Sequence, residues 1–255
     1  MSDHFEERFG PVVGKGAQAT VYADGRYAVK LYREGYPKGY VFSEAYMMAN
    51  LEKENFPSPR VYEVLLVDGR YGIRMDQVKG RLMAEAIADP VRYNEALDAL
   101  VNLQCRVQRL GTGVQWAPDI KERLRGDLLR STRLSDRRRQ TLLEKLQKLP
   151  GGNGLCHCDF HAGNVFFDGK DYIIIDLLQI ARGDPAADAA CSYVSYSFAG
   201  GEIAKDYLNR YCEASGIARE DVMRWVPPYA GMLLGEVPKE YAPILERFIG
   251  SDGEG

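Results

Sequence analysis

The sequence has no long apolar run. None of its 255 residues belongs to an apolar stretch that approaches the ~20 residues needed to cross a bilayer. The chain begins with the polar segment MSDHFEERFG, which lacks the hydrophobic core of a secretory signal. We therefore expect a cytoplasmic protein that does not interact with membranes.

Cysteine and histidine are scarce as well. Five cysteines are an odd number and do not suggest a disulfide framework in a chain of this length. Cys156, His157, Cys158 and His161 lie close together, but a C-x-C pair is not the usual zinc spacing and no second ligand group completes a tetrahedral shell. A Cys–His nucleophile has equally weak support, because accidental pairs are common. The pattern favours reduced thiols without a zinc site.

The chain also lacks a strong net charge. Its formal charge of -3 gives no general attraction to nucleic acid or to anionic lipid. Residues 119–149 do contain ten Lys/Arg against five Asp/Glu, including Arg137, Arg138 and Arg139. Leucines interrupt this stretch at helical spacing, which is typical of amphipathic helices with a solvated basic face. We expect no nucleic-acid partner.

The chain does contain three Asp-Gly pairs that mark candidate turns, two in its first part and one further on. Asp24-Gly25, Asp68-Gly69 and Asp168-Gly169 each separate two β-prone runs, and each can supply the positive φ angles of a hairpin. A helix from about Ser43 to Glu54 interrupts the strands, with Ser43 as its cap. Glu44 shares the apolar face of this helix, so it requires a cation.

Beyond Gly80 the pattern becomes helical. One leucine-rich stripe ends near Gly111, a second ends before Pro150, and Asp184-Pro185 predicts the cap and first turn of a helix to about Phe198. A further helix from Glu202 is expected to stop near Gly216. We therefore expect an α+β protein, with a small antiparallel β lobe over residues 1–78 and a larger, mainly α-helical lobe over residues 79–255. A cleft between the lobes is the expected ligand site.

Two segments of the β lobe suggest phosphate binding. Gly14 and Gly16 lie at a turn between candidate strands, where backbone amides can approach a phosphate without hindrance from a side chain. The segment does not match a P-loop, because no Lys-Ser/Thr pair and no helix follow it. Lys30 interrupts a β-branched and aromatic run, so it is expected to be partly buried. A Lys30–Glu44 pair leaves the ammonium group available to phosphates.

The segment from Leu155 to Phe167, followed by Tyr172 to Asp176, carries the most specific chemistry. A short polar loop enters a strand at Asn164, and a hairpin returns the chain to Asp176. Asn164 and Asp176 can therefore face one site and supply the oxygen ligands that Mg²⁺ prefers. Asp159, earlier in the loop, is expected to accept a hydroxyl proton.

This pattern, H-x-D-x-H-x-G-N with a following I-I-D, resembles the aminoglycoside phosphotransferase and choline kinase family, which has a two-lobed protein-kinase-like fold. The resemblance runs from about Val12 to Ala190 and implies a kinase that uses ATP and Mg²⁺. It implies that Asp159 is the catalytic base and that Asn164 and Asp176 bind the metal. The residues that it implies for nucleotide binding are Gly14, Gly16, Lys30, Glu44, Met75, Asp76 and Val78.

Further positions agree with or depart from this family. Asp188 resembles the aspartate that supports the family's catalytic loop, although an aspartate in the first turns of a helix can also simply stabilise the helix dipole. Ala19 replaces the third glycine of the phosphate loop, and Leu177 follows the metal aspartate. Only seven residues separate Asp176 from Asp184, too few for a peptide-docking segment. His161 stands where protein kinases carry lysine. The short segment and the histidine at position 161 both favour a small hydroxyl substrate over a peptide.

The function predicted from these residues is phosphorylation of a hydroxyl group on a small molecule. A catalytically silent ATP-binding pseudokinase is the alternative. Residues 184–255 contain twelve Asp/Glu against six Lys/Arg, together with several aromatic residues, a combination that favours a cationic acceptor resembling an aminoglycoside or choline. A neutral sugar or a homoserine-like acceptor stays open, because these acids can also belong to solvated helix surfaces.

Overall fold

The computed structural model describes residues 4–110 and 114–250, which pack as two units. Residues 4–83 form the first unit together with 163–178, and residues 84–162 form the second together with 179–250. The lobe boundary expected after residue 78 stays a prediction. The mixed α+β class, with an antiparallel sheet and a helical region, is confirmed.

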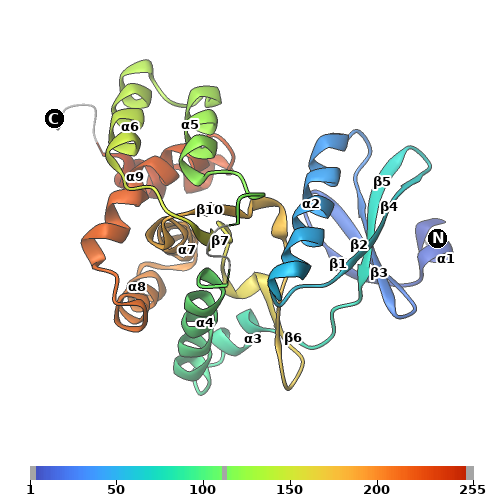
Figure 1. Ribbon diagram of the computed structural model, residues 1–255. Helices are drawn as coiled ribbons and strands as arrows, with labels where there is room; N and C mark the ends of the chain where they lie inside the picture. The colour runs from blue at the N-terminus through green and yellow to red at the C-terminus, as the bar shows by residue number, and fades with distance from the viewer. Residues whose placement is uncertain (1–3, 111–113, 251–255) are drawn as a thin grey trace. The chain divides into compact units, whose positions relative to one another are not determined.

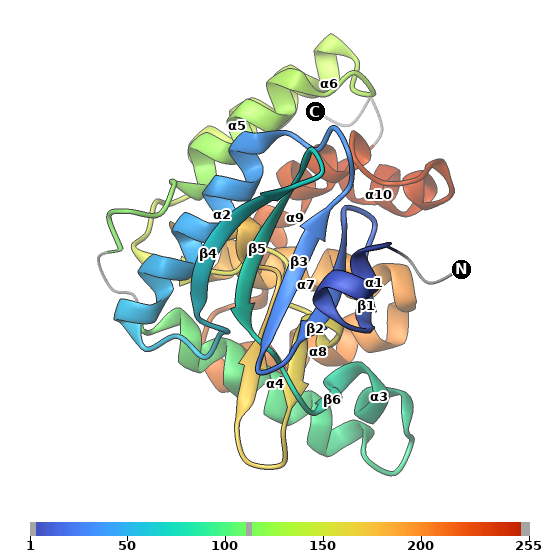
Figure 2. The same ribbon diagram turned by 90° about the vertical axis from the view of Figure 1, so that its right-hand side faces the viewer.

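The first unit is built on a five-stranded antiparallel sheet with strand order β1-β2-β3-β5-β4. Its strands and the helices around them are α1 (His4–Phe9), β1 (Val12–Lys15), β2 (Ala19–Asp24), β3 (Tyr27–Tyr32), α2 (Lys38–Leu51), η1 (Glu52–Glu54), β4 (Val61–Val67) and β5 (Arg70–Asp76). Helix α2 packs on β4 and β5, as Figure 2 shows. On the sheet, Phe9 of α1 joins the apolar cluster of Tyr22, Val29, Leu31 and Val67.

A smaller sheet, with order β6-β8-β9, brings residues from much later in the chain into the same unit. Its strands are β6 (Arg81–Leu82), β8 (Val165–Phe167) and β9 (Tyr172–Ile174). Arg81 pairs with Phe167, and the Ile174 N–H donates to the Pro57 carbonyl at 2.7 Å. These backbone contacts join 163–178 to the first unit.

The expected hairpins are confirmed. Asp68 and Gly69 both have positive φ angles, 50° and 79°, between β4 and β5, and Gly25 has a φ of 66° between β2 and β3. The third hairpin has a longer connection, residues 168–171. Within it, the Asp168 carboxylate accepts the backbone N–H groups of Lys170 and Asp171 at 2.8 Å. Asp-Gly therefore marks each of these reversals, with different local geometry at the third.

The predicted start of α2 at Ser43 is wrong. The helix begins at Lys38 after Pro37, which makes no side-chain cap, and Ser43 lies exposed within it. The helix ends at Leu51 and continues as the 3-10 turn η1 to Glu54. Glu44, Met48 and Leu51 are buried, so the predicted face is confirmed although the first turn was missed.

The second unit is mainly helical. Its elements are α3 (Met83–Ala88), α4 (Tyr93–Gln108), α5 (Ile120–Arg130), α6 (Asp136–Lys148), β7 (Gly154–Cys156), β10 (Ala181–Gly183), α7 (Pro185–Ala199), α8 (Gly201–Ser215), α9 (Arg219–Leu234), η4 (Lys239–Tyr241) and α10 (Ala242–Ile249). Helix α7 packs against both α8 and α9 (Figure 1). The short 3-10 turns η2 (Ala162–Asn164) and η3 (Leu177–Gln179) lie where the chain passes between the units.

The helix boundaries in this unit follow the predicted signals. Asp184 caps α7 by accepting the Ala186 N–H at 3.0 Å, and Pro185 occupies the first turn. Helix α8 ends at Ser215, and Gly216 follows as its C-cap with a φ of 74°. Helix α4 ends at Gln108; the predicted stop at Gly111 lies outside the described residues.

Candidate functional site

Lys30 and Glu44 form an ion pair inside the first unit. Lys30 lies on β3 and Glu44 on α2, and the Lys30 Nζ lies 2.6 Å from Glu44 Oε1. The same Nζ lies 3.7 Å from Asp176 Oδ1. Burial opposes the charge on Lys30, but the carboxylates of Glu44 and Asp176 outweigh it and raise the pKa of Lys30. Lys30 is therefore a fixed cation between two carboxylates.

Asn164 and Asp176 are brought together by the β8–β9 hairpin. Asn164 ends η2 immediately before β8, and Asp176 lies two residues after the end of β9. The Ile175 N–H donates to the Asn164 carbonyl at 2.9 Å, so the two chain segments are hydrogen-bonded next to both side chains. Asp176 has a φ of 61°, a conformation that costs a non-glycine residue energy. Asn164 is buried, whereas Asp176 is half exposed.

The turn that contains Gly14 and Gly16 is open. A Cβ added at Gly16 meets only the Ala19 carbonyl, at 3.7 Å, and neither glycine has a positive φ. Within the turn, the Gly16 N–H donates to the Ala19 carbonyl at 2.9 Å. The glycines are therefore not required by backbone strain, and close approach of a ligand remains the predicted reason for them.

Met75 and Asp76 end β5, and Val78 follows two residues later. The Asp76 N–H donates to the Arg60 carbonyl at 3.0 Å. The Asp76 carboxylate accepts from the Arg60 N–H at 3.1 Å and from the Tyr62 hydroxyl at 2.8 Å. The side chain of Asp76 therefore fixes the start of β4, a role that the sequence pattern did not reveal.

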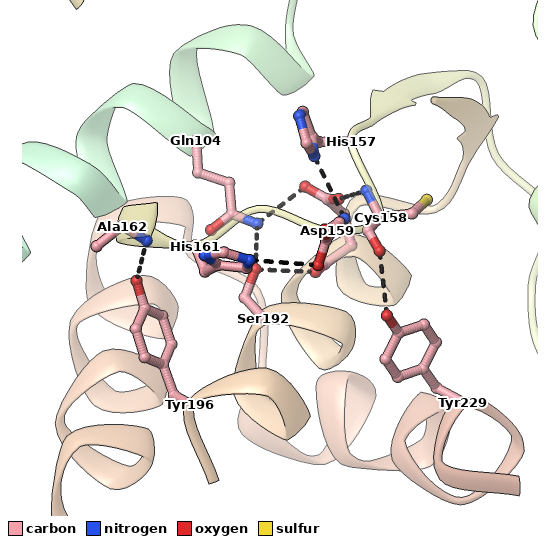
Figure 3. Close-up of polar contacts among 10 residues, drawn as sticks. Gln104, His157, Cys158, Asp159, His161, Ala162, Ser192, Tyr196 and Tyr229 are labelled. Carbon is pink, nitrogen blue, oxygen red and sulfur yellow. Dashed lines mark hydrogen bonds and ion pairs between the residues drawn. The ribbon is translucent and has the colours of Figure 1, made fainter. Parts of the chain in front are cut away.

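In the second unit, Asp159 lies on a loop that many backbone contacts hold in place (Figure 3). The Asp159 N–H donates to His157 Nδ1 at 3.3 Å, and the Asp159 Oδ1 lies 3.5 Å from His161 Nε2. The Ala162 N–H donates to the Tyr196 hydroxyl at 3.0 Å, and the Tyr229 hydroxyl donates to the Cys158 carbonyl at 3.1 Å. Helices α7 and α9 thus hold both sides of Asp159.

Asp188 of α7 supports the same loop through a hydrogen bond to its backbone. It is fully buried on α7, and its Oδ1 accepts the Cys158 N–H at 2.7 Å. Cys158 has a φ of 64°, so this bond holds a strained residue immediately before Asp159. Burial raises the pKa of Asp188 to about 6, and the charge interaction with the Cys158 side chain adds to the effect, whereas the hydrogen bond from the Cys158 N–H opposes it. Of the two roles considered for Asp188, the geometry shows loop support.

A set of neutral partners surrounds the other oxygen of Asp188. Gln104 and Gln108 of α4 donate to its Oδ2 at 2.9 and 2.8 Å. Their own oxygens accept from the hydroxyls of Tyr207 and Tyr211 on α8. Sequence analysis missed these residues, although Gln104 and Gln108 occupy positions on the apolar stripe of α4 where leucine is expected. A glutamine on an apolar stripe was the available signal.

The sequence model of the phosphotransferase enzyme family matches residues 12–226 of this chain. The match covers most of the sequence. The chain belongs to the phosphotransferase enzyme family. No curated protein sequence matches the chain.

Solved structures show the same fold as this phosphotransferase. An amicoumacin kinase, hAmiN, in complex with AMP-PNP, Ca²⁺ and Ami is similar with a TM-score of 0.68 at 15% identity, covering 94% of this chain and 86% of that chain. An aminoglycoside phosphotransferase from Streptomyces rimosus, in complex with ADP and streptomycin, gives 0.65 at 18% identity, covering 89% and 95%. A choline/ethanolamine kinase family protein from Mesorhizobium loti gives 0.61 at 15%, covering 91% and 80%.

The donor atoms of this phosphotransferase suit a magnesium ion better than a zinc ion. Among the described residues, no group of three or more His, Cys, Asp or Glu can hold a metal. Asn164 and Asp176 instead offer an amide oxygen and a carboxylate, and Mg²⁺ typically takes one or two carboxylates with waters and phosphates. The residues therefore fit a metal that is shared with a phosphate ligand.

The basic stretch of the phosphotransferase has internal partners. Arg133 donates to the carbonyls of Leu234 and Val237 at 2.9 and 2.7 Å, and Arg139 donates to those of Leu128, Ser131 and Leu134. Arg138 pairs with Glu246 of α10. These three guanidinium groups hold the ends of α5 and α9 and dock α10, so each of these arginines has a structural role. Across the described residues, no helix is both long enough and apolar enough to span a bilayer.

Proposed function

We propose that this chain transfers the γ-phosphoryl group of ATP, bound with Mg²⁺, to a hydroxyl group of a small molecule. The observation that carries the proposal is the fixed Lys30 cation between Glu44 and Asp176. A buried ion pair of this kind is costly to desolvate, so it is expected where its charge has a task. Nucleotide-bound relatives of the same fold, solved with AMP-PNP or ADP, support the choice of ATP.

Lys30 is the proposed ligand of the α- and β-phosphates, and Glu44 orients it. Gly14 and Gly16 are proposed to let backbone amides approach the phosphates. At the adenine, Met75 lines the proposed pocket, and Val78 offers its backbone N–H. Because the Asp76 N–H already donates to Arg60, the contribution of Asp76 falls to its carbonyl oxygen.

Asn164 and Asp176 are the proposed magnesium ligands. When bound, Mg²⁺ neutralises charge on the β- and γ-phosphate oxygens. Lys30 Nζ lies 3.7 Å from Asp176 Oδ1, so the cation that contacts the phosphates and the carboxylate that holds the metal belong to one preorganised group.

Asp159 is the proposed base. Its carboxylate accepts the proton of the acceptor hydroxyl as the new oxygen–phosphorus bond forms and the bond between the γ-phosphorus and the bridging oxygen breaks, so that ADP leaves. The loop contacts of Asp188, Tyr196 and Tyr229 hold Asp159 in place. Asn164 follows after only four intervening residues, which ties the base to a metal ligand in one short segment. No specific observation favours the pseudokinase alternative, since the charged residues needed for the reaction are present.

For the acceptor we propose a cationic hydroxyl compound, such as an aminocyclitol or an amino alcohol. The acidic excess over residues 184–255 supports this class, and a streptomycin complex among the similar structures is consistent with it. Some of those acids have internal partners: Asp184 accepts from Trp225, Asp188 is buried, and Glu246 pairs with Arg138. Asp206 and Asp221 have partners as well, in Tyr93 and Arg224. The other acids that the structure describes, among them the exposed Glu202 and Glu213, therefore carry the proposal.

The experiment is ADP release from Mg-ATP across aminoglycosides, amino alcohols, sugars and hydroxy amino acids, with Asp159→Asn as the matched variant. We expect turnover with cationic acceptors and a loss of kcat of roughly 10²- to 10⁴-fold in the variant, the usual effect of a positioned base. Turnover limited to neutral or anionic acceptors contradicts the acceptor class alone. Nucleotide binding without turnover of any compound supports the pseudokinase instead.

A further inference from the structure

Glu44 uses its two carboxylate oxygens for different partners. Oε1 receives Lys30 Nζ at 2.6 Å, and Oε2 accepts a hydrogen bond from the hydroxyl of Tyr32, a buried residue at the end of β3. Burial, together with the nearby Glu44 carboxylate, raises the pKa of Tyr32 above its ordinary range. The Tyr32 hydroxyl therefore stays protonated and remains a donor that holds the carboxylate opposite Lys30.

Tyr36 continues the contact away from Glu44. Its ring stacks on that of Tyr32 at a centroid distance of 4.8 Å and an interplanar angle of 18°. The chain reverses between these residues, because the Tyr36 N–H donates to the Arg33 carbonyl at 3.2 Å and Gly35 adopts a φ of 73°. This turn places the second ring over the first.

The hydroxyl of Tyr36 then reaches the glycine turn. It donates to Gln18 Oε1 at 2.8 Å, while the Gln18 carbonyl accepts the Arg33 N–H at 2.9 Å. Gln18 lies in the exposed segment 16–18, in the turn whose two glycines are proposed to let backbone amides approach the phosphates. A continuous series of contacts therefore joins the Lys30–Glu44 pair, through two tyrosines, to the tip of the glycine turn.

We propose that Tyr36, acting through Gln18 and stacked on Tyr32, is a positioning residue that holds the glycine turn in register with Lys30 for binding the phosphates of ATP. This inference rests on the proposed function. The turn is short and exposed, so without a tether it samples more conformations, and a ligand must then offset the entropy of ordering it. Neither tyrosine is proposed to touch the nucleotide.

The test compares ATP and adenosine in titrations of four proteins: wild type, Tyr36→Phe, Gln18→Ala and the double variant. Tyr36→Phe keeps the stacked ring and removes only the hydroxyl. We expect each single variant to bind ATP about three- to tenfold more weakly, the typical effect of one lost hydrogen bond, and to bind adenosine unchanged. The double variant is expected to match the singles, because all three lack the same bond. In turnover, KM for ATP rises while kcat is nearly constant.

Tyr40→Phe is the matched control. Tyr40 is exposed, and its ring lies 6.0 Å from that of Tyr36 in a tilted arrangement, outside the series of contacts. It is expected to bind both ligands as the wild type does. An equal loss of ATP and adenosine affinity in Tyr36→Phe, or additive losses in the double variant, overturns the inference. If the wild type binds no ATP, both the proposed function and this inference are wrong. If the wild type binds ATP and the variants bind it equally tightly, only the proposed role of Tyr36 is wrong.

Discussion

At the scale of single residues, the site consists of charges whose burial is tolerated because each has an assigned partner. Glu44 is buried against both Lys30 and Tyr32, and Asp188 is buried against three N–H donors without a cation. The two arrangements differ in the partner that each buried carboxylate has: Glu44 has a cation, whereas the partners of Asp188 are neutral N–H groups. Lys30 and Glu44 stabilise each other's charge, whereas burial makes the charge of Asp188 expensive. Substitutions at Lys30 are therefore expected to change both activity and stability, whereas Asp188 is expected to make stability depend on pH.

Lys30→Met is expected to lower kcat/KM for ATP by roughly 10²- to 10³-fold, the range seen when one electrostatic contact to the reacting group is lost. It also leaves Glu44 without its cation, which is expected to cost a few kcal/mol of unfolding free energy. Adding Glu44→Gln to Lys30→Met removes the unpaired charge, so stability is expected to recover while activity stays low. Chemical unfolding and steady-state kinetics on both variants measure this, and recovery of activity in the double variant contradicts a direct role for Lys30.

The raised pKa of Asp188 predicts that the free energy of unfolding depends on pH. This pKa of about 6 in the folded protein lies above the ordinary value near 4, so the folded state binds the proton more tightly. The stabilising contribution is thus complete below about pH 4 and is lost as the pH rises through 6, by up to about 3 kcal/mol at 1.36 kcal/mol per pH unit. Denaturant unfolding of wild type and Asp188→Asn from pH 4.5 to 7.5 checks this, with the surface variant Asp221→Asn as control. A difference between wild type and Asp188→Asn that does not change with pH is the contrary result.

At the scale of elements, the sequence predicted what local chemistry decides. Asp-Gly pairs marked the hairpins and Asp184-Pro185 marked α7, because turn and cap preferences act within a few residues. The start of α2 was missed because Pro37 offers no side-chain cap, so no local signal exists. In the site, Lys30 and Glu44 were paired correctly from a burial argument. The glutamine and tyrosine partners of Asp188 were not predicted, because they depend on how α4, α7 and α8 pack.

A pair of alanine substitutions tests the corrected helix boundary. Asp184→Ala is expected to destabilise the protein by about 1 to 2 kcal/mol, since it removes a cap that accepts the Ala186 N–H. Ser43→Ala has the opposite expectation: Ser43 is exposed inside α2, where alanine is the better helix former by up to about 0.5 kcal/mol. Thermal or urea unfolding compares them. A loss near 1 kcal/mol at Ser43 restores it as a cap.

At the scale of the whole molecule, the proposed nucleotide and metal ligands come from one packing unit and the proposed base comes from the other. Residues 163–178 group with the N-terminal unit because β8 pairs with β6 and Ile174 bonds to Pro57. This long-range pairing groups Asn164 with the first unit, whereas Asp159 groups with the second, although both lie in one loop of the sequence. No local pattern contains that information, since it depends on which strand β8 meets.

The division predicts that nucleotide binding and phosphoryl transfer can be separated by substitution. Asp159→Asn is expected to keep the Mg-ATP affinity of the wild type while losing turnover, because Asp159 belongs to the unit without the proposed nucleotide ligands. Asp176→Ala is expected to lose both turnover and the effect of Mg²⁺ on ATP affinity, because it removes a proposed metal ligand. ATP is titrated into wild type, Asp159→Asn and Asp176→Ala, once with Mg²⁺ and once with EDTA. For wild type and Asp159→Asn, the binding curve with Mg²⁺ is expected to differ from the curve with EDTA. For Asp176→Ala, the two binding curves are expected to coincide. A metal effect that persists in Asp176→Ala assigns the metal to other ligands, and a large loss of affinity in Asp159→Asn places that residue in nucleotide binding.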